Sequence, residues 1–163
     1  MGKLMSIIQA QHIYLDVNIF IYWLEEYPHY VQMLTELFQL IDNSQLQAVT
    51  SELTLAEALV KPIMDDDNNL QQTYQDMLTT NAGLHVVPIS DEILIEAAKL
   101  RAKNTKIKLP DAIHAATAYA TQCQAFITND KALKAIPDIK VIILSEIATL
   151  FASGKRSALG ESS

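Results

Sequence analysis

The sequence has 163 residues, a length that fits one domain with a core of its own. Half of its residues are hydrophobic and 19% are charged, a globular composition that excludes disorder for all but the ends. The net charge of −7 gives no global attraction for nucleic acid, so any RNA contact needs a local basic patch. The densest one, Arg101 to Lys108, is either that contact or a solvated helix end.

Cysteine content and apolar runs bear on the cellular compartment. Cys123 is the only cysteine, so no disulfide can form within the chain, which fits a reducing cytosol. The apolar run of residues 13–24 is interrupted by Asp16 and Asn18, and the run of residues 4–8 is too short for a signal-peptide core. We therefore expect a cytoplasmic protein without a membrane span.

Short apolar runs rich in β-branched residues alternate with longer segments of helical period. This alternation predicts a three-layer α/β/α domain with a mainly parallel central sheet. The expected strands cover residues 13–16, 47–50, 84–88, 125–128 and 140–144. The expected helices cover residues 18–25, 30–42, 54–60, 69–80, 91–103 and 111–121.

No repeat or linker divides the chain, so we expect a single domain over residues 1–151. Residues 152–163 are small and polar and lack a periodic apolar face, which predicts a mobile tail. Ser90 is placed to cap a helix with an acidic first turn, and Pro110 stands where a helix can begin without an amide hydrogen. Gly83 is expected to end the helix before it.

Four acids stand at expected strand ends and helix starts. Asp16 ends the first strand, and Asp130 follows the fourth strand. Glu57 lies one turn into the helix after the second strand, and Asp111 lies in a first helical turn after Pro110. An open α/β sheet forms its binding crevice beyond the carboxyl ends of its strands, so all four acids can converge there.

Each acid taken singly has a simpler explanation. Asp16 or Asp130 could cap the following helix, Asp111 could favour its helix dipole, and Glu57 could lie in solvent. These explanations account less well for the set, because Asp16 is flanked by apolar residues, where an ionised carboxylate needs compensation. A divalent cation supplies it, and hard cations such as Mg²⁺ and Mn²⁺ take oxygen ligands.

Four motifs resemble the PIN domain family, and in particular the VapC toxins of prokaryotic toxin–antitoxin pairs. They are Tyr-Leu-Asp-Val-Asn at residues 14–18, Thr-Leu-Ala-Glu at 54–57, Leu-Pro-Asp-Ala-Ile-His-Ala-Ala-Thr at 109–117 and Thr-Asn-Asp at 128–130. Any one motif is weak evidence, but their order and spacing are specific and span most of the chain. The resemblance implies that the metal-binding and catalytic site consists of Asp16, Glu57, Asp111 and Asp130.

The resemblance further implies a divalent-metal-dependent endoribonuclease, a hydrolase in which Mg²⁺ or Mn²⁺ activates water against an RNA phosphodiester. Three aspartates would bind metal directly or through water, and Glu57 would bind metal or orient the attacking water. Cleavage would leave 5′-phosphate and 3′-hydroxyl ends. The implied substrate is structured RNA such as tRNA or rRNA, and the implied protein partners are a cognate antitoxin and a second copy of the chain in a homodimer.

Other residues of the motifs carry a weaker signal. Val17 stands where such toxins often have Thr or Ser, so a possible hydroxyl near the metal is absent. Asn18 is either a polar site residue or the cap of its helix, and the roles of Thr128 and Asn129 are open in the same way. His114 lies one turn after the aspartate of the third motif, and a hydrogen-bonded packing role is favoured over a catalytic one.

Aromatic residues gather near the first two expected helices, namely Phe20, Trp23, Tyr27 and Tyr30. They either fill the core or form a twofold interface between two copies of the chain. A groove between these helices could also receive an amphipathic helix of the antitoxin, and the acids would attract one of its Arg or Lys residues.

Competing enzyme classes lack their motifs. The sequence has only four glycines and contains no glycine-rich phosphate loop or dinucleotide fingerprint. It has no His-Glu-x-x-His helix, and Cys123 lacks partners at zinc-site spacing. A phosphoacceptor receiver would need a middle-strand acid and a late lysine that are not found. The remaining alternative is a non-catalytic PIN-like module that binds RNA or protein without a productive metal site.

Overall fold

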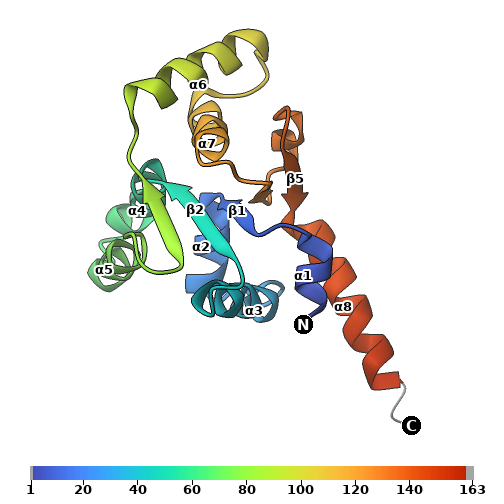
Figure 1. The fold of residues 1–163 in the computed structure, drawn as a ribbon. Helices are drawn as coiled ribbons and strands as arrows, with labels where there is room; N and C mark the ends of the chain where they lie inside the picture. The colour runs from blue at the N-terminus through green and yellow to red at the C-terminus, as the bar shows by residue number, and fades with distance from the viewer. Residues whose placement is uncertain (1, 161–163) are drawn as a thin grey trace.

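The centre of the fold is a five-stranded sheet, seen in a computed structural model that describes the backbone of residues 2–160 and the side chains of residues 2–153. Every neighbouring pair of its strands is parallel, as the sequence predicts. The strand order is β3-β2-β1-β4-β5 (Figure 1). The strands are β1 (His12–Leu15), β2 (Gln47–Ser51), β3 (Leu84–Val87), β4 (Ala125–Thr128) and β5 (Lys140–Ile143).

The strand order contains a switch point between β1 and β4. From β1 the chain builds outward through β2 to β3, and it then returns to place β4 on the other side of β1. In open α/β sheets the binding crevice forms beyond the carboxyl ends of the strands at such a point. The residues that directly follow β1 and β4 are therefore placed to form a site.

Helices cover both faces of the sheet and give the predicted three layers. They are α1 (Lys3–Ile8), α2 (Val17–Leu24), α3 (Val31–Asp42), α4 (Leu53–Met64), α5 (Asn68–Met77), α6 (Asp91–Lys103), α7 (Leu109–Ala120) and α8 (Leu144–Gly160). A short 3₁₀ helix, η1 (Lys131–Ala135), follows β4. Helices α6 and α7 lie on one side of the sheet, and α2 and α3 lie on the other (Figure 1).

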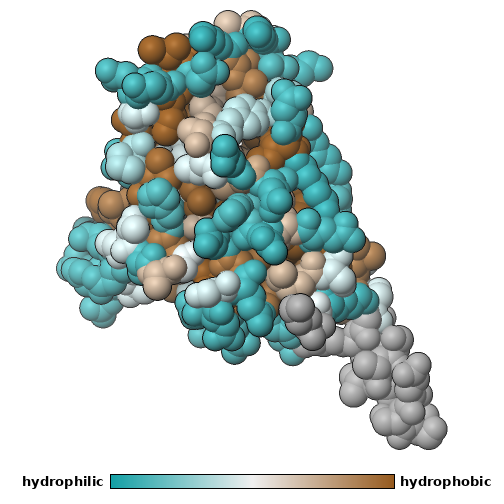
Figure 2. Space-filling view, in the orientation of Figure 1, coloured by the Kyte–Doolittle hydropathy of each residue, from teal (hydrophilic) through white to brown (hydrophobic). Residues whose placement is uncertain are grey.

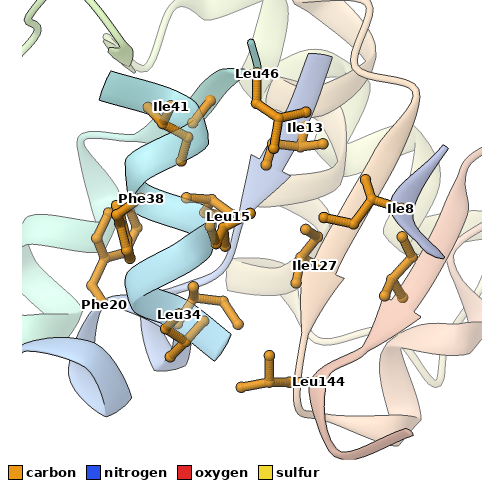
Figure 3. Packing of buried hydrophobic residues seen from close by; sticks show 14 of the residues in the cluster. Ile8, Ile13, Leu15, Phe20, Leu34, Phe38, Ile41, Leu46, Ile127 and Leu144 are labelled. Carbon is orange, nitrogen blue, oxygen red and sulfur yellow. The ribbon is translucent and has the colours of Figure 1, made fainter. Parts of the chain in front are cut away.

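The core has two hydrophobic clusters because successive side chains of a strand point to opposite faces. Ile13 and Leu15 of β1 pack in the cluster that includes α2 and α3, as Figure 3 shows. Tyr14, between them, packs in the cluster with α6 and α7. The three side chains are fully buried, which is typical of a parallel sheet covered on both faces.

Several predicted helix ends are confirmed. The Ser90 hydroxyl accepts a hydrogen bond from the Ile93 amide at the start of α6, and Pro110 lies in the first turn of α7. The prediction for Gly83 is wrong, because α5 ends at Met77. Glycine is needed there for close packing instead, since a Cβ at this position would lie 2.7 Å from Cγ2 of Ile41.

Two helices at the ends of the chain were not predicted. Helix α1 has six residues, and its buried Leu4 and Ile8 are too few for a clear period. Helix α8 runs to Gly160 and therefore includes residues 152–160 of the predicted tail, for which no helix was predicted. Ile147 and Phe151 lie one turn apart on α8, and both are buried in the hydrophobic cluster that includes α2 and α3. Residues 161–163 of that predicted tail lie outside the described residues.

The early aromatic residues divide between core and surface. Phe20 is fully buried, and the Trp23 ring stacks on Phe38 at a centroid distance of 4.0 Å. Tyr27 is 40% exposed. Figure 2 shows hydrophilic residues over much of the visible face, with smaller hydrophobic areas between them. Among the described helices, none has the length and apolar character needed to cross a bilayer.

Candidate functional site

Asp16 lies at the switch point, directly after β1, and caps α2. Its Oδ1 accepts a hydrogen bond from the Val17 amide at 2.9 Å, and its Oδ2 accepts one from the Thr128 hydroxyl at 2.7 Å. The side chain is only 6% exposed. Burial raises the pKa of Asp16, while the charge of His114 and both hydrogen bonds act in the opposite direction. The capping role proposed for Asp16 alone is thus real, and it coexists with an energetically costly buried carboxylate.

Asp130 follows β4 on the other side of the switch point. It is exposed, and its Oδ1 caps η1 by accepting a hydrogen bond from the Ala132 amide at 3.0 Å. Its own amide donates to the Thr128 hydroxyl oxygen at 3.1 Å. Since the same hydroxyl donates to Asp16, Thr128 connects the two aspartates across the ends of β1 and β4.

Asp111 lies in the first turn of α7 and is half-buried. Burial is the largest cause that raises the pKa of its carboxyl, and the charges of Asp16, Asp130 and Glu57 raise it further. The charge of His114 acts against this increase. Among the described residues, none donates a hydrogen bond to the Asp111 side chain. It is therefore a carboxylate exposed to the repulsion of three others.

Glu57 is held by a histidine that the sequence did not place in the site. Nε2 of His114 lies 2.5 Å from Oε1 of Glu57, and Nδ1 of the same ring lies 2.5 Å from the Tyr14 hydroxyl. Burial lowers the pKa of His114, but the hydrogen bond to Glu57 and the charges of the surrounding acids outweigh it, so the pKa lies above its usual value. The predicted hydrogen-bonded, buried histidine is confirmed.

Asn18 does not cap its helix, because Asp16 takes that position. Its Oδ1 accepts a hydrogen bond from the Asn129 amide at 3.2 Å, and its Nδ2 lies 3.5 Å from both Oδ2 of Asp16 and Oγ1 of Thr128. Asn18 is thus a polar member of the site. The sequence left this choice open, since the same residue type serves both roles.

Asn129 fixes the exit of β4 to its surroundings. Its Nδ2 lies 3.3 Å from the hydroxyls of Tyr22 and Tyr30, and its Oδ1 accepts a hydrogen bond from the Ser145 amide at 2.9 Å. These partners come from α2, the start of α3 and α8. No periodic pattern in the sequence signals such contacts, although a polar run after a buried strand marks the position.

Electrostatic coupling shows which acids share one neighbourhood. Asp111 senses the charges of Asp16, Asp130 and Glu57, and Asp16 senses that of Glu57. Within the described part of the chain, no three His, Cys, Asp or Glu side chains are arranged to hold a metal ion together. The oxygen-only donor set still fits Mg²⁺, which is commonly bound through one or two carboxylates and keeps several waters.

Comparison with known families settles the relationship that the motifs suggested. The model of the PIN domain matches residues 13–139, which include all four acids. The chain belongs to the PIN domain family. No protein of curated function matches the chain by sequence.

Solved structures share the fold of this PIN domain. One is VapBC2 from Rickettsia felis bound to a promoter DNA fragment, with a TM-score of 0.64, 20% identity, and coverage of 81% of this chain and 98% of that chain. A toxin–antitoxin complex from Klebsiella pneumoniae matches with a TM-score of 0.60, 25% identity, and coverage of 81% and 97%. VapC20 from Mycobacterium tuberculosis, a toxin that cleaves the sarcin-ricin loop, matches with a TM-score of 0.63 and 14% identity. The match covers 79% of this chain and 98% of that chain.

The crowding of acids predicts that Asp111→Asn stabilises the metal-free protein at neutral pH. The pKa of Asp111 is raised by folding, so the wild type loses stability as pH rises from the ordinary pKa of the group through the raised one. We expect the melting temperature of the variant to be higher by about 1 to 3 °C at pH 7. The increase is small because solvent screens this half-buried group. The gain should vanish near pH 3, where the wild-type carboxyl is protonated.

Calorimetry in EDTA between pH 3 and pH 8 measures this effect. Asp91→Asn is the matched control, since Asp91 is an exposed acid in the first turn of α6, away from the coupled carboxylates. It should leave melting unchanged or lower it through the helix dipole. Equal shifts in the two variants would contradict repulsion at the site.

Proposed function

We propose that this PIN domain is a divalent-metal-dependent endoribonuclease and the toxin of a VapBC-type pair. The observation that carries the proposal is that the charges of Asp16, Asp130 and Glu57 raise the pKa of Asp111, near the switch point of the sheet. Members of the family are generally nucleases, and its solved neighbours include toxin–antitoxin complexes. Oxygen ligands at a crevice suit hard cations, for which Mg²⁺ is the proposed physiological choice and Mn²⁺ the alternative.

The proposed mechanism assigns a task to each acid. Asp16, Asp111 and Asp130 would hold the metal directly or through water, and Glu57 would bind it or orient the attacking water. A bound Mg²⁺ or Mn²⁺ supplies an activated water and neutralises charge at the phosphate. Thr128 and the Val17 amide hold the Asp16 carboxylate in one orientation. Hydrolysis would leave 5′-phosphate and 3′-hydroxyl ends on structured RNA such as tRNA or rRNA.

Cleavage of total RNA in Mg²⁺ or Mn²⁺ should fall at least roughly 100-fold in Asp16→Asn, Asp111→Asn and Asp130→Asn. Changes to residues that only surround a metal site already lower activity by up to about 100-fold, and loss of a ligand should cost at least as much. Each change removes one charged ligand while nearly preserving size. Asp65→Asn, at an exposed acid after α4, is the control and should cleave like the wild type.

Contaminating ribonuclease is the main error in this assay, so all variants must be purified in parallel and tested with EDTA. Folded Asp→Asn variants with near wild-type cleavage would refute the assignment of the site. A metal-loaded wild type that binds RNA without cleaving it would instead establish the non-catalytic PIN-like module.

A basic stretch leads directly into the acidic site and supports RNA as the substrate. Arg101 and Lys103 end α6, and Lys106 and Lys108 lie in the loop before α7. Within the described part of the chain, none of the four forms a salt bridge. Lys108 lies three residues before Asp111, so about one helical turn separates them. We propose that Lys106 and Lys108, which lead into the first turn of α7, hold RNA phosphates beside the one that is cleaved.

Replacing Lys106 and Lys108 together by Gln should raise KM with little change in kcat, because these lysines would bind the RNA backbone without touching the reacting phosphate. The slope of log affinity against log salt should become less steep by roughly 0.7 to 0.9 for each phosphate that is no longer neutralised. Filter binding in EDTA measures the slope. Lys61→Gln on α4 is the control, and an unchanged slope in the double variant would place the RNA elsewhere.

An antitoxin is the proposed protein partner. An apolar hollow of about 160 Å³ lies near the ends of α2, α3 and α5, and Trp23, Phe38, Ile41, Met77 and Leu84 are among its lining residues. Seven residues, or about 10 Å of helix, separate Trp23 from Asp16. An amphipathic antitoxin helix in this hollow could therefore place an Arg or Lys at the acids.

Self-association into a homodimer is also part of the proposal. Several large apolar side chains remain exposed on the described surface of α4 and α6, namely Val60, Ile63, Met64, Leu94 and Ile95. They can contribute to a twofold interface, whereas the buried Phe20 serves the core.

The product of the neighbouring gene should bind this chain and suppress cleavage, and it should lose inhibition when its inserted basic residue is replaced. Met77→Glu at the hollow should weaken the complex at least about tenfold, because it replaces an apolar surface and buries a charge. Leu150→Glu on α8, at a leucine that is 53% exposed, is the matched control. Calorimetric titration measures both. A neighbour that neither binds nor inhibits would remove the toxin role and leave the nuclease assignment.

A further inference from the structure

We propose that His114 is a positioning residue that fixes the Glu57 carboxylate in the site through a hydrogen-bonded chain of Tyr14, His114 and Glu57. This inference rests on the proposed nuclease function and names a residue outside the four acids. The chain joins three elements, since Tyr14 lies in β1, His114 in α7 and Glu57 in α4. His114 would act through Glu57 and would not touch the RNA.

The two hydrogen bonds of His114 leave its ring little freedom. Nδ1 contacts the Tyr14 hydroxyl and Nε2 contacts Oε1 of Glu57, each at 2.5 Å. The ring is fully buried, so water cannot replace either partner. Tyr14 is itself fixed, because its ring stacks on Phe126 of β4 at a centroid distance of 4.8 Å and an angle of 20°. The central strands thus anchor one end of the chain.

Proton inventory gives the chain a direction. A carboxylate only accepts hydrogen bonds, so Nε2 of His114 must donate to Glu57 whether the imidazole is neutral or charged. A tyrosine hydroxyl ordinarily titrates at about pH 10, so at neutral pH the Tyr14 hydroxyl keeps its hydrogen. In the neutral ring that hydroxyl donates to Nδ1, which selects the tautomer with hydrogen on Nε2.

The consequence concerns the other oxygen of Glu57. His114 engages Oε1, and within the described part of the chain no residue hydrogen-bonds to Oε2. A glutamate has three rotatable side-chain bonds, and one on a half-buried helix face would otherwise sample several rotamers. Holding Oε1 confines the carboxylate and leaves Oε2 without a hydrogen bond from the described residues, while the charge of Glu57 acts on Asp16 and Asp111. Carboxylates that bind metal ions are commonly oriented by hydrogen bonds from neighbouring groups.

A buried histidine could instead only stabilise the fold, and matched substitutions separate the two roles. His114→Leu removes both hydrogen bonds at similar volume, and His114→Gln keeps an amide donor for Glu57. We expect the Leu variant to lower kcat for RNA cleavage by about 10- to 100-fold with KM within about twofold, as outer-shell changes do. The Gln variant should regain most of the loss. Circular dichroism confirms which variants are folded.

The decisive comparison uses Glu57→Ala. If His114 acts through Glu57, adding His114→Leu to Glu57→Ala should change kcat by less than about twofold, because interacting residues are not additive. An equal loss with and without Glu57 would overturn the proposal, as would a folded Leu variant with wild-type kcat. A Gln variant that is folded but as slow as the Leu variant would also count against it.

Nuclear magnetic resonance tests the chain without relying on cleavage. The Nε2 proton of His114 is buried and should give a slowly exchanging, downfield resonance, absent in His114→Gln. It should move upfield in Glu57→Gln, since neutral acceptors form weaker hydrogen bonds than carboxylates. No such proton, or no response to Glu57→Gln, would overturn the positioning role. If the wild type cleaved no RNA while this signal behaved as expected, the nuclease assignment alone would fail. Mn²⁺ should then raise the melting temperature less in His114→Leu than in the wild type, and an equal rise would overturn the role of His114 toward metal.

Discussion

The parallel pairing of β1 with β4 is the constraint on which the rest of the site depends. Leu15 pairs with Ile127, and the Asp16 amide donates to the Ile127 carbonyl at 3.0 Å, so the ladder continues one residue beyond β1. This register fixes where β1 and β4 each end at the edge of the sheet. A shift by one residue would turn Tyr14 toward the other face and would break its contact with His114. Fold and site are therefore specified by the same hydrogen bonds.

The site places a carboxylate, that of Asp16, where little solvent can screen its charge. Asp16 is nearly enclosed, and yet it has three polar neighbours, the Val17 amide, the Thr128 hydroxyl and the Asn18 amide group. Among residues 2–153, whose side chains the structure describes, dipoles contact this carboxylate but no cationic side chain does. His114, whose charge when protonated acts on Asp16 and Asp111, is hydrogen-bonded to Glu57. A bound cation would balance the charge of these acids, and the proposed nuclease function supplies one.

Local signals made the framework predictable. All five strands lie within one or two residues of the predicted ranges, because β-branched runs buried on both faces have a clear sequence pattern. The positions of the acids relative to these elements were predictable for a related reason, since Asp16 and Asp130 follow strands and Asp111 and Glu57 lie near helix starts. Helix α1 is too short for a clear period, and residues 152–160 lack the apolar face that would have indicated a helix.

Contacts between side chains far apart in the sequence could not be predicted. His114 meets Glu57 over a separation of 57 residues, and Thr128 meets Asp16 over 112. Neither pair leaves a period or spacing in the sequence. A buried histidine beside one acidic motif also satisfies the general expectation of a packed, hydrogen-bonded ring, so its link to a second motif becomes visible only in three dimensions.

The bonding of Asn129 gives the C-terminal helix a mechanical tie to the chemistry. One amide side chain holds the exit of β4 against two tyrosine hydroxyls and against the first turn of α8, and Asp130 is the next residue. A displacement of α8 would therefore move Asn129 and, with it, the adjacent Asp130. A molecule or fused segment that contacts α8 is thereby connected through Asn129 to the position of Asp130.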